Sequence, residues 1–401
     1  MADLPTSTDV VIAGAGPTGL TLALTLIRLG VDTRIVDPLP GPVTESRANL
    51  MHAGSLERFD VLGVAGELVD RGAVAHRSEI RSDGRLIAIS DWTQLDTRFP
   101  MTLLIPQSTT EFVLDAALVA AGAGVARGWA VRDFTTSARS VDVAVTGEDE
   151  IRSIATRFLV GCDGAHSEVR KRMGVGFSGR SYPESLLVAD CKATAVREGF
   201  SGVFFTRSDG FLVATGMRDG LTRIGASIDA GHEFTGPAIS SIVASRTNGA
   251  IVPQGVEWSN VFRTHRRQVE RMREGRVVLA GDAAHVHSPA GGQGMNLGIR
   301  DAFDLGHRLA AHLGGQAPID ILDDDDEQRR AEATHVLANT HRLLRMYTAT
   351  GVGRRLADTF VRLGEKVGVS DRITVEISGI NSKWPPGVVR PLSAAHGDPS
   401  T

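Results

Sequence analysis

The stretch Asp9-Val10-Val11-Ile12-Ala13-Gly14-Ala15-Gly16-Pro17-Thr18-Gly19 decides the fold of the amino-terminal part of the chain. Its apolar run, residues 9–13, is typical of a buried strand, and the glycines follow it at once. Residues 18–29 then carry apolar side chains at helical spacing up to Gly30, and residues 33–36 form a second apolar run. The pattern predicts a strand-helix-strand unit of a doubly wound α/β fold.

The spacing G-x-G-x-x-G has a physical purpose at this junction. The first glycine allows the tight turn, the second lets a phosphate approach the backbone, and the third permits close packing of helix on strand. The helix N-terminus offers free N–H groups, and an aspartate after the second strand can accept a hydrogen bond from an adenosine ribose. The expected binding residues are Gly14, Gly16, Pro17, Thr18, Gly19 and Asp37. We favour a dinucleotide site over a turn selected only for packing, although the motif does not distinguish FAD from NAD.

Composition and charge disfavour several classes of protein. The chain has 401 residues, 42% apolar content and a net charge of −4, which suits a globular protein with two cores. Its cations are scattered, so no nucleic-acid partner is expected. Residues 1–9 lack a signal-peptide pattern and no apolar run reaches membrane-spanning length, so we expect a cytoplasmic protein without a membrane partner. Cys162 and Cys191 have no metal-like spacing and are expected to be buried and reduced.

The periodicity changes twice further along the chain. Residues 186–261 contain short β-type segments separated by turn residues, which predicts an inserted antiparallel sheet. After Asp282 the pattern is mainly helical, with helical spacing over 301–313 and over a long stretch of about 324–367. The acidic run 323–327 is interpreted as the solvated first turn of a helix rather than a metal site.

Two later segments narrow the choice of protein class. Residues 158–167 and 276–285 each indicate a strand that ends in a turn bearing an aspartate, Asp163 and Asp282 respectively. Together with the glycine motif, they make the chain similar to the class A flavoprotein monooxygenases, the para-hydroxybenzoate hydroxylase superfamily. The resemblance is closest to the aromatic polyketide and antibiotic hydroxylase branch, and its motifs spread over about the first 310 residues.

The resemblance implies a non-covalent FAD and further residues that contact it. Beyond the glycine motif and Asp37, the family pattern places the following residues along the cofactor: Arg47, Gln107, Asp163, Asp282, Pro289, Gly292, Gly294, Met295 and Asn296. A helix beginning near Asn296 would direct N–H groups at the flavin edge where negative charge develops on reduction. Helix capping is the alternative for the two aspartates, and His285 and His287 are interpreted as structural because no third metal ligand is evident.

The expected fold class is α/β, with a Rossmann-like FAD-binding domain, an inserted β-sheet substrate domain and C-terminal helices. The FAD-binding domain is expected to comprise 1–75, 101–185 and 262–320, and the substrate domain 76–100 and 186–261. A helical region at 321–383 and a flexible tail at 384–401 would follow.

The expected reaction depends on the cofactor. No second dinucleotide motif follows a strand and no redox Cys-x-x-Cys is present. The resemblance therefore implies that NADPH or NADH reduces the flavin, O2 forms a flavin C4a-hydroperoxide, and a polycyclic aromatic or polyketide-type small molecule is hydroxylated. An alternative is an FAD-bound, non-redox cyclisation or pericyclic catalyst in natural-product biosynthesis. The chain would act as a monomer or a homodimer.

Substrate contacts are expected from the inserted sheet and from the loop 91–102. The candidate side chains are Trp92, Phe99, Met101, Phe204, Phe205 and Phe211, whose apolar surface suits a flat ligand, although each could be an ordinary core residue. The chain departs from the family where Asp325-x-x-Gln328-Arg329 replaces a common Tyr-x-x-Glu-Arg pattern, which puts the local packing in doubt.

Overall fold

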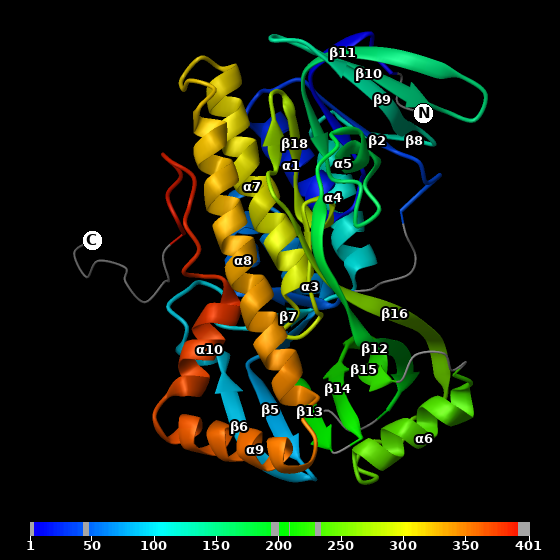
Figure 1. The fold of residues 1–401 in the computed structure, drawn as a ribbon, viewed down its shortest axis with the longest axis vertical. Coiled ribbons are helices and arrows are strands. Elements are labelled where there is room, and N and C mark those ends of the chain that lie inside the picture. The colour runs from blue at the N-terminus through cyan, green and yellow to red at the C-terminus, as the bar shows by residue number, and fades with distance from the viewer. Residues whose placement is uncertain (1–3, 43–47, 194–199, 208, 229–233, 392–401) are drawn as a thin grey trace.

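The computed structural model describes residues 4–42, 48–193, 200–207, 209–228 and 234–391. Two eight-stranded sheets and one three-stranded sheet form the framework, and helices cover them (Figure 1). The α/β fold class predicted from the sequence is confirmed.

The first sheet contains the predicted strand-helix-strand unit. β1 (Ser7–Ala13) lies at its centre and pairs in parallel with β2 (Thr33–Asp37) and with β11 (Ile151–Gly161). The remaining strands are β8 (Val125–Arg127), β9 (Ala130–Thr136), β10 (Val141–Thr146), β17 (Arg273–Glu274) and β18 (Val277–Leu279). Because β1, β2 and β11 are parallel, the glycine motif, Asp37 and Asp163 all lie at one edge of the sheet.

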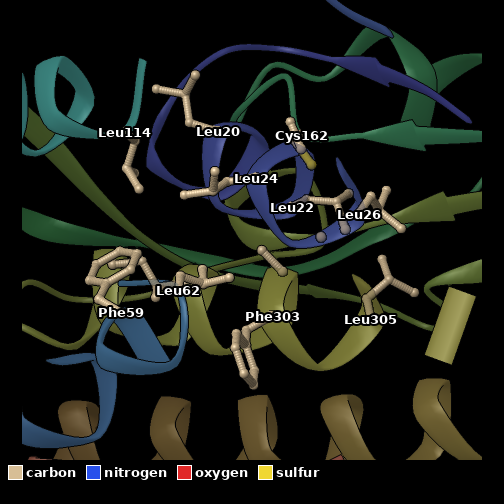
Figure 2. Packing of buried hydrophobic residues seen from close by; sticks show 14 of the residues in the cluster. Leu20, Leu22, Leu24, Leu26, Phe59, Leu62, Leu114, Cys162, Phe303 and Leu305 are labelled. Carbon is tan, nitrogen blue, oxygen red and sulfur yellow. The ribbon is translucent and has the colours of Figure 1, made fainter. Parts of the chain in front are cut away.

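Helices enclose the apolar core beside this sheet. They are α1 (Pro17–Arg28), α2 (Ala53–Val61), α3 (Ala65–Arg71), α4 (Gln107–Ala120), α5 (Glu168–Arg172) and α7 (Gln293–Leu313). Residues 19–26 of α1 are all buried, as in a helix surrounded by protein on every side. Figure 2 shows the leucines of α1 packed near Phe303 of α7. A Cβ atom at Gly306 would lie 2.7 Å from the Thr25 side chain, so this glycine permits the close approach of the two helices.

The second sheet lies at the other end of the molecule. Its strands are β5 (Arg77–Ser82), β6 (Arg85–Asp91), β12 (Phe177–Lys192), β13 (Phe200–Arg207), β14 (Gly210–Gly216), β15 (Leu221–Ile228), β16 (Val256–Val269) and β19 (His285–Val286). A small sheet of β3 (Leu50–His52), β4 (Ala73–Ala75) and β7 (Thr102–Leu104) lies between the larger two (Figure 1). The long strands β12 and β16 run from the middle of the molecule into the second sheet, across the domain boundaries expected near residues 185 and 261 (Figure 1).

The carboxyl-terminal part is helical. The long stretch with helical spacing forms two helices, α8 (Ile321–Tyr347) and α9 (Gly351–Lys366), which precede α10 (Val369–Ser378). α6 (Gly236–Arg246) packs on the opposite face of the second sheet from α8. The short 3-10 helices are η1 (Trp92–Gln94), η2 (Arg218–Gly220) and η3 (Gly281–Ala283). No helix among the described residues has the length and apolarity needed to cross a bilayer.

The segment 384–391 differs from the flexible tail expected there. The Arg58 guanidinium lies 4.7 Å from the Trp384 ring, and Arg390 donates two hydrogen bonds at 2.7 and 3.0 Å to the same Glu57 oxygen. These contacts hold the segment against α2. Residues 392–401 lie outside the described part of the chain.

Candidate functional site

The glycine motif forms a turn that is tight on one side and open on the other. A Cβ atom at Gly14 would lie 2.5 Å from the Cys162 carbonyl oxygen, and one at Gly19 would lie 1.9 Å from the Gly14 carbonyl oxygen. No described atom lies within 4 Å of a Cβ atom at Gly16. The backbone at Gly16 is therefore open to an approaching group, as the binding of a pyrophosphate requires.

The start of α1 offers hydrogen-bond donors at the same place. Gly16 is the N-cap, Pro17 occupies the first turn, and no described side chain caps the helix. The free N–H groups and the helix dipole of this turn favour an anion. The Thr18 side chain packs instead against η3 and α7, since Cβ atoms at Gly281 and Gly298 would lie 2.5 and 2.4 Å from its hydroxyl oxygen.

Asp37 stabilises the glycine turn directly. Its carboxylate accepts hydrogen bonds from the Ala15 N–H at 2.7 Å and the Leu39 N–H at 2.9 Å, and the Arg127 guanidinium lies 3.7 Å away. The carboxylate is mostly buried at the edge of the sheet. Its expected contact with a ribose hydroxyl stays a prediction, and these bonds show that the residue also holds the turn in shape.

Asp163 has one occupied and one unoccupied carboxylate oxygen. Oδ2 accepts hydrogen bonds from the N–H groups of Glu168 and Val169, which is the helix-capping role considered as the alternative. Oδ1 is buried and has no hydrogen-bond partner among the described residues. Burial raises the pKa of Asp163. A buried acceptor without a donor is costly, so Oδ1 fits a site completed by a donor from a bound molecule.

The third part of the site is the turn before α7. Gly291 and Gly292 have φ of +79° and +62°, and α7 begins at Gln293, three residues earlier than expected. No described side chain caps its N-terminus, and Pro289 is exposed beside it. The N–H groups at this helix end are therefore not capped by a described side chain, and their contact with a developing negative charge stays a prediction.

The Asn296 side chain has an internal role. Its carbonyl oxygen accepts from the His52 N–H at 2.8 Å, and its amide donates to the carbonyl oxygens of Leu50 and Gly292. Asn296 is completely buried and fixes the turn before α7 to β3. The sequence motif predicted that Asn296 lies near the start of this helix. It did not predict the hydrogen bonds of Asn296 to Leu50 and His52, which are far away in the chain.

The structure describes four of the five other predicted cofactor residues. Gly294 lies beside His287, Met295 is partly buried against the core, and Asp282 is exposed on η3. Gln107 begins α4 and donates to Glu111 at 2.9 Å. Arg47 lies outside the described residues. The histidines fit the structural interpretation, because His285 bonds to Asp301 at 2.6 Å and His287 to the Ser288 carbonyl oxygen at 2.8 Å.

An apolar cavity lies next to Gly291. It encloses about 860 Å³ of space free of protein atoms, open solvent at its mouth included. Its walls come from β3, β5, β6, β7, β13, the 3-10 helix η1 and the helices α8, α9 and α10. The lining residues are Leu50, His52, Ser78, Ile80, Ala88, Ser90, Trp92, Thr102, Phe204, Gly291, Leu343, Met346, Tyr347, Phe360, Val361, Val369, Ser370, Ile373, Thr374 and Ile377. None of these residues is acidic, lysine or arginine, so the cavity suits an uncharged ligand.

Two of the six predicted substrate residues line this cavity, namely Trp92 and Phe204. Phe204 stacks on Tyr347 with ring centroids 5.3 Å apart. Phe205, its neighbour on β13, faces the opposite side and packs in the cluster under α6, because successive strand residues alternate. Phe99, Met101 and Phe211 pack in core clusters and do not line the cavity.

The cavity residues of α8 and α10 were missed from the sequence. Leu343, Met346 and Tyr347 share one face of α8, and Val369, Ile373 and Ile377 share one face of α10. The sequence predicted a helical region at 321–383, with helical spacing over about 324–367. That pattern did not show that the apolar faces of α8 and α10 would border a cavity rather than a filled core.

His52 is the polar side chain at the junction of cavity and cofactor turn. Its Nε2 lies 2.8 Å from the Gly291 carbonyl oxygen, which requires the Nε2–H tautomer, and Nδ1 lies 3.5 Å from the Thr102 hydroxyl. Its ring stacks on Trp92 with an interplanar angle of 14°. Burial lowers the pKa of His52 to about 4. The neutral imidazole therefore holds both the turn and the indole in place.

The pKa of His52 leads to a testable stability difference. Because the folded-state pKa of about 4 lies below the ordinary 6.5, the unfolded state binds more protons, and stability falls as pH drops from 6.5 to 4. The loss from this residue is on the order of 3 kcal/mol. The variant His52→Gln keeps a hydrogen-bond donor for Gly291 but has no imidazole to protonate. Urea unfolding at a series of pH values should therefore show that its free energy of unfolding falls less between pH 6.5 and pH 4 than that of the wild type. An equal fall in the free energy of unfolding of both proteins would contradict a buried, neutral His52 imidazole.

The fold and the nucleotide turn define a dinucleotide-binding protein of the doubly wound α/β class. A family model described as FAD binding domain matches residues 7–340, and the chain belongs to this family. The expectation of an FAD-dependent monooxygenase of the class A, aromatic-hydroxylase type is also confirmed.

Named relatives support this assignment. A 12-dehydrotetracycline 5-monooxygenase/anhydrotetracycline 6-monooxygenase from Streptomyces rimosus is 35% identical over 349 residues, which are 83% of this chain and 68% of that protein. The structure of the anhydrotetracycline hydroxylase OxyS from Streptomyces rimosus gives a TM-score of 0.82 at 32% identity and covers 96% and 78% of the two chains. A Diels-Alderase from the biosynthetic pathway of pyrroindomycins gives 0.80 at 26% identity, with coverage of 95% and 82%.

Proposed function

We propose that the protein hydroxylates an uncharged, polycyclic aromatic or polyketide-type small molecule, with NADPH or NADH as reductant and O2 as co-substrate. The observation that carries the proposal is the apolar cavity bordered by Gly291, immediately before the N-terminus of α7. When bound, FAD would supply the electron transfer and the activation of O2. The protein would supply binding, orientation and exclusion of water.

Each part of the site has a separate task in this proposal. The open side of the glycine turn and the N-terminus of α1 hold the pyrophosphate, and Asp163 Oδ1 accepts a hydrogen bond from the cofactor. The N-terminus of α7 stabilises negative charge on the ring system. Trp92 and Phe204 orient the flat substrate, while α8, α9 and α10 keep water away from it.

The reaction can be tested directly on the purified protein. Heat denaturation should release FAD, and a polycyclic probe should stimulate oxidation of NADPH or NADH. Anhydrotetracycline is a suitable first probe, because the relative from Streptomyces rimosus is named for it. With isotopically labelled O2, mass spectrometry should find one labelled oxygen in the product. Product labelled only from water, or no oxidation of either reductant across a panel of polycyclic probes, would contradict the proposal.

The non-redox catalyst is the second candidate function. The fold shared with a Diels-Alderase favours it, while the monooxygenase relatives favour hydroxylation. The two candidates predict different products from the same bound cofactor. A cyclised product of unchanged elemental composition, formed without NADPH or NADH, would support the second candidate.

Two adjacent residues of β13 provide a matched test of the cavity. Phe204→Leu should raise the KM for the probe by about tenfold, because the ring that stacks on Tyr347 and borders the cavity is lost. Phe205→Leu removes an equal side chain from the cluster under α6 and should lower stability by about 1 kcal/mol without a change in KM. Steady-state kinetics and urea unfolding distinguish the two. Equal KM values in both variants would place the substrate elsewhere.

A further inference from the structure

α9 carries a continuous apolar stripe that is open to solvent. Its members are Val352, Leu356, Phe360, Leu363 and, one residue past the helix end, Val367, with exposed fractions of 72, 66, 65, 58 and 71%. The spacing of four, four, three and four residues places them on one side of the helix. Isolated exposed apolar residues are common, whereas a contiguous stripe of this kind marks an interaction surface.

The opposite side of α9 is firmly packed, so the stripe is not a core face turned outward. Arg354 is buried and bonds to Asp358 and to the Met346 carbonyl oxygen, both at 2.9 Å. A Cβ atom at Gly364 would lie 3.1 Å from Val369 of α10. Figure 1 shows α9 at the outer edge of the molecule, in front of β5 and β6. The helix is therefore fixed through its inner face and offers its outer face to a partner.

The charges beside the stripe identify the kind of partner. Arg355, Arg362 and Lys366 are exposed, share one flank of the helix, and form no ion pair with any described residue. The acidic residues of α9 are engaged elsewhere: Asp358 bonds to Arg354 and Ser82, and Glu365 accepts from the Ile89 N–H. The outer face thus combines apolar side chains with unpaired cations.

A second copy of the chain fits this face poorly. An antiparallel pairing that matches Val352 with Val367 and Leu356 with Leu363 puts Arg355 opposite Gly364 of the other copy, two residues from both Arg362 and Lys366. A parallel pairing gives the cations no anionic partner, because the flank of the other copy that they meet carries Gly353, Ala357 and Gly364. Neither arrangement gives the cations an anionic partner, whereas an anionic bilayer attracts every cation and accepts the apolar stripe.

We propose that α9 docks the protein on the surface of an anionic lipid bilayer. The helix lies in the plane of the interface, with the stripe in the boundary between headgroups and acyl chains and the three cations against lipid phosphates. This arrangement needs no membrane-spanning helix, and it revises the expectation that the protein has no membrane partner.

Docking of α9 would have a consequence for the cavity. Phe360 belongs both to the exposed stripe and to the cavity lining, and Val361 next to it also borders the cavity. The apolar surface is therefore continuous from the outer face of α9 into the cavity. A poorly water-soluble ligand could enter from the bilayer along this surface without full hydration.

Vesicle co-sedimentation of the purified, FAD-loaded protein tests the proposal. We expect binding to vesicles of equal parts phosphatidylglycerol and phosphatidylcholine to be at least about tenfold tighter than to pure phosphatidylcholine, and to weaken with salt. The double variants Leu356→Gln/Leu363→Gln and Arg355→Glu/Arg362→Glu should each lose at least about tenfold in affinity. None of these four residues lines the cavity.

Matched controls lie far from α9. Val119→Gln replaces a side chain on α4 that is 62% exposed, and Arg132→Glu/Arg139→Glu reverses two charges on or beside β9; all should bind like the wild type. FAD content and thermal unfolding verify that the α9 variants are folded. Equal binding to both vesicle types, no binding, or wild-type binding by both α9 variants would overturn the proposal. So would a dimer, detected by light scattering, that Leu356→Gln/Leu363→Gln abolishes.

Discussion

Gly19→Ala is expected to abolish retention of FAD and to lower stability by several kcal/mol. The added Cβ atom would lie 1.9 Å from the Gly14 carbonyl oxygen, a backbone atom that cannot move without opening the turn. The glycine turn is also held by the hydrogen bond that the Ala15 N–H donates to the Asp37 carboxylate at 2.7 Å. The absorbance spectrum of the purified variant and urea unfolding of its apoprotein measure the two effects.

Gly16→Ala separates cofactor binding from folding. The Gly16 backbone is extended, with φ of −75°, and no described atom lies within 4 Å of the new Cβ atom. The apoprotein should therefore unfold like the wild type, while affinity for FAD should fall by at least about tenfold because the methyl group occupies the pyrophosphate side of the turn. Gly66→Ala on α3, where the space is also open, should change neither affinity nor fold.

Two results with these glycine variants would contradict the assignment of the cofactor turn. A Gly16→Ala variant with wild-type FAD affinity would show that the open side of the turn does not face the cofactor. A Gly19→Ala variant as stable as the wild type would show that the turn relaxes more easily than its backbone contact indicates.

Elements that depend on neighbouring residues could be predicted from the sequence, whereas features that depend on distant residues could not. The glycine motif is local, so the turn, α1 and the neighbouring strands could be predicted from adjacent residues. α7 begins at Gln293, three residues before the start that the sequence predicted near Asn296. Its N-cap is Gly292, which has a positive φ and no side chain that could have marked the helix end. Local chemistry fixes such elements to within a turn of helix.

The cavity was predictable only in part, because long-range packing forms it. Trp92 and Phe204 were selected by residue type, which gave no means of knowing that β13 would turn Phe205 toward α6. Tyr347 reaches the cavity only after α8 has crossed the molecule (Figure 1). His52 lies in a short strand, and its partner Gly291 is separated from it by most of the chain.

The acidic run 323–327 shows where local interpretation fails. Asp323 and Asp324 are exposed in the first turn of α8, as predicted, but the interpretation of the whole run as solvated is wrong for Asp325, which is completely buried. Its two oxygens accept from Arg308 at 2.7 Å and from Arg329 at 2.6 Å. Gln328 accepts from the same Arg308 at 2.9 Å, so the departure from the family's Tyr-x-x-Glu-Arg pattern is compatible with a paired, packed cluster.

Asp325→Ala is therefore expected to destabilise the protein by about 3–5 kcal/mol, because it leaves two buried guanidinium groups without their common carboxylate. Arg329 also donates to the Leu279 carbonyl oxygen at 2.9 Å, next to the strand end that leads into η3. The loss should consequently reach the cofactor site, and weaker FAD retention should accompany lower stability.

Two variants of the same run show whether burial is the cause. Asp324→Ala changes an exposed carboxylate one residue away and should alter stability by less than about 0.5 kcal/mol. Asp325→Asn keeps a hydrogen-bond acceptor but removes the charge, so its loss of stability should lie between those of Asp324→Ala and Asp325→Ala. Urea unfolding of the apoproteins measures the differences directly. Similar values for Asp324→Ala and Asp325→Ala would mean that Arg308 and Arg329 find water or other partners, and that the buried cluster does not hold α8 against α7.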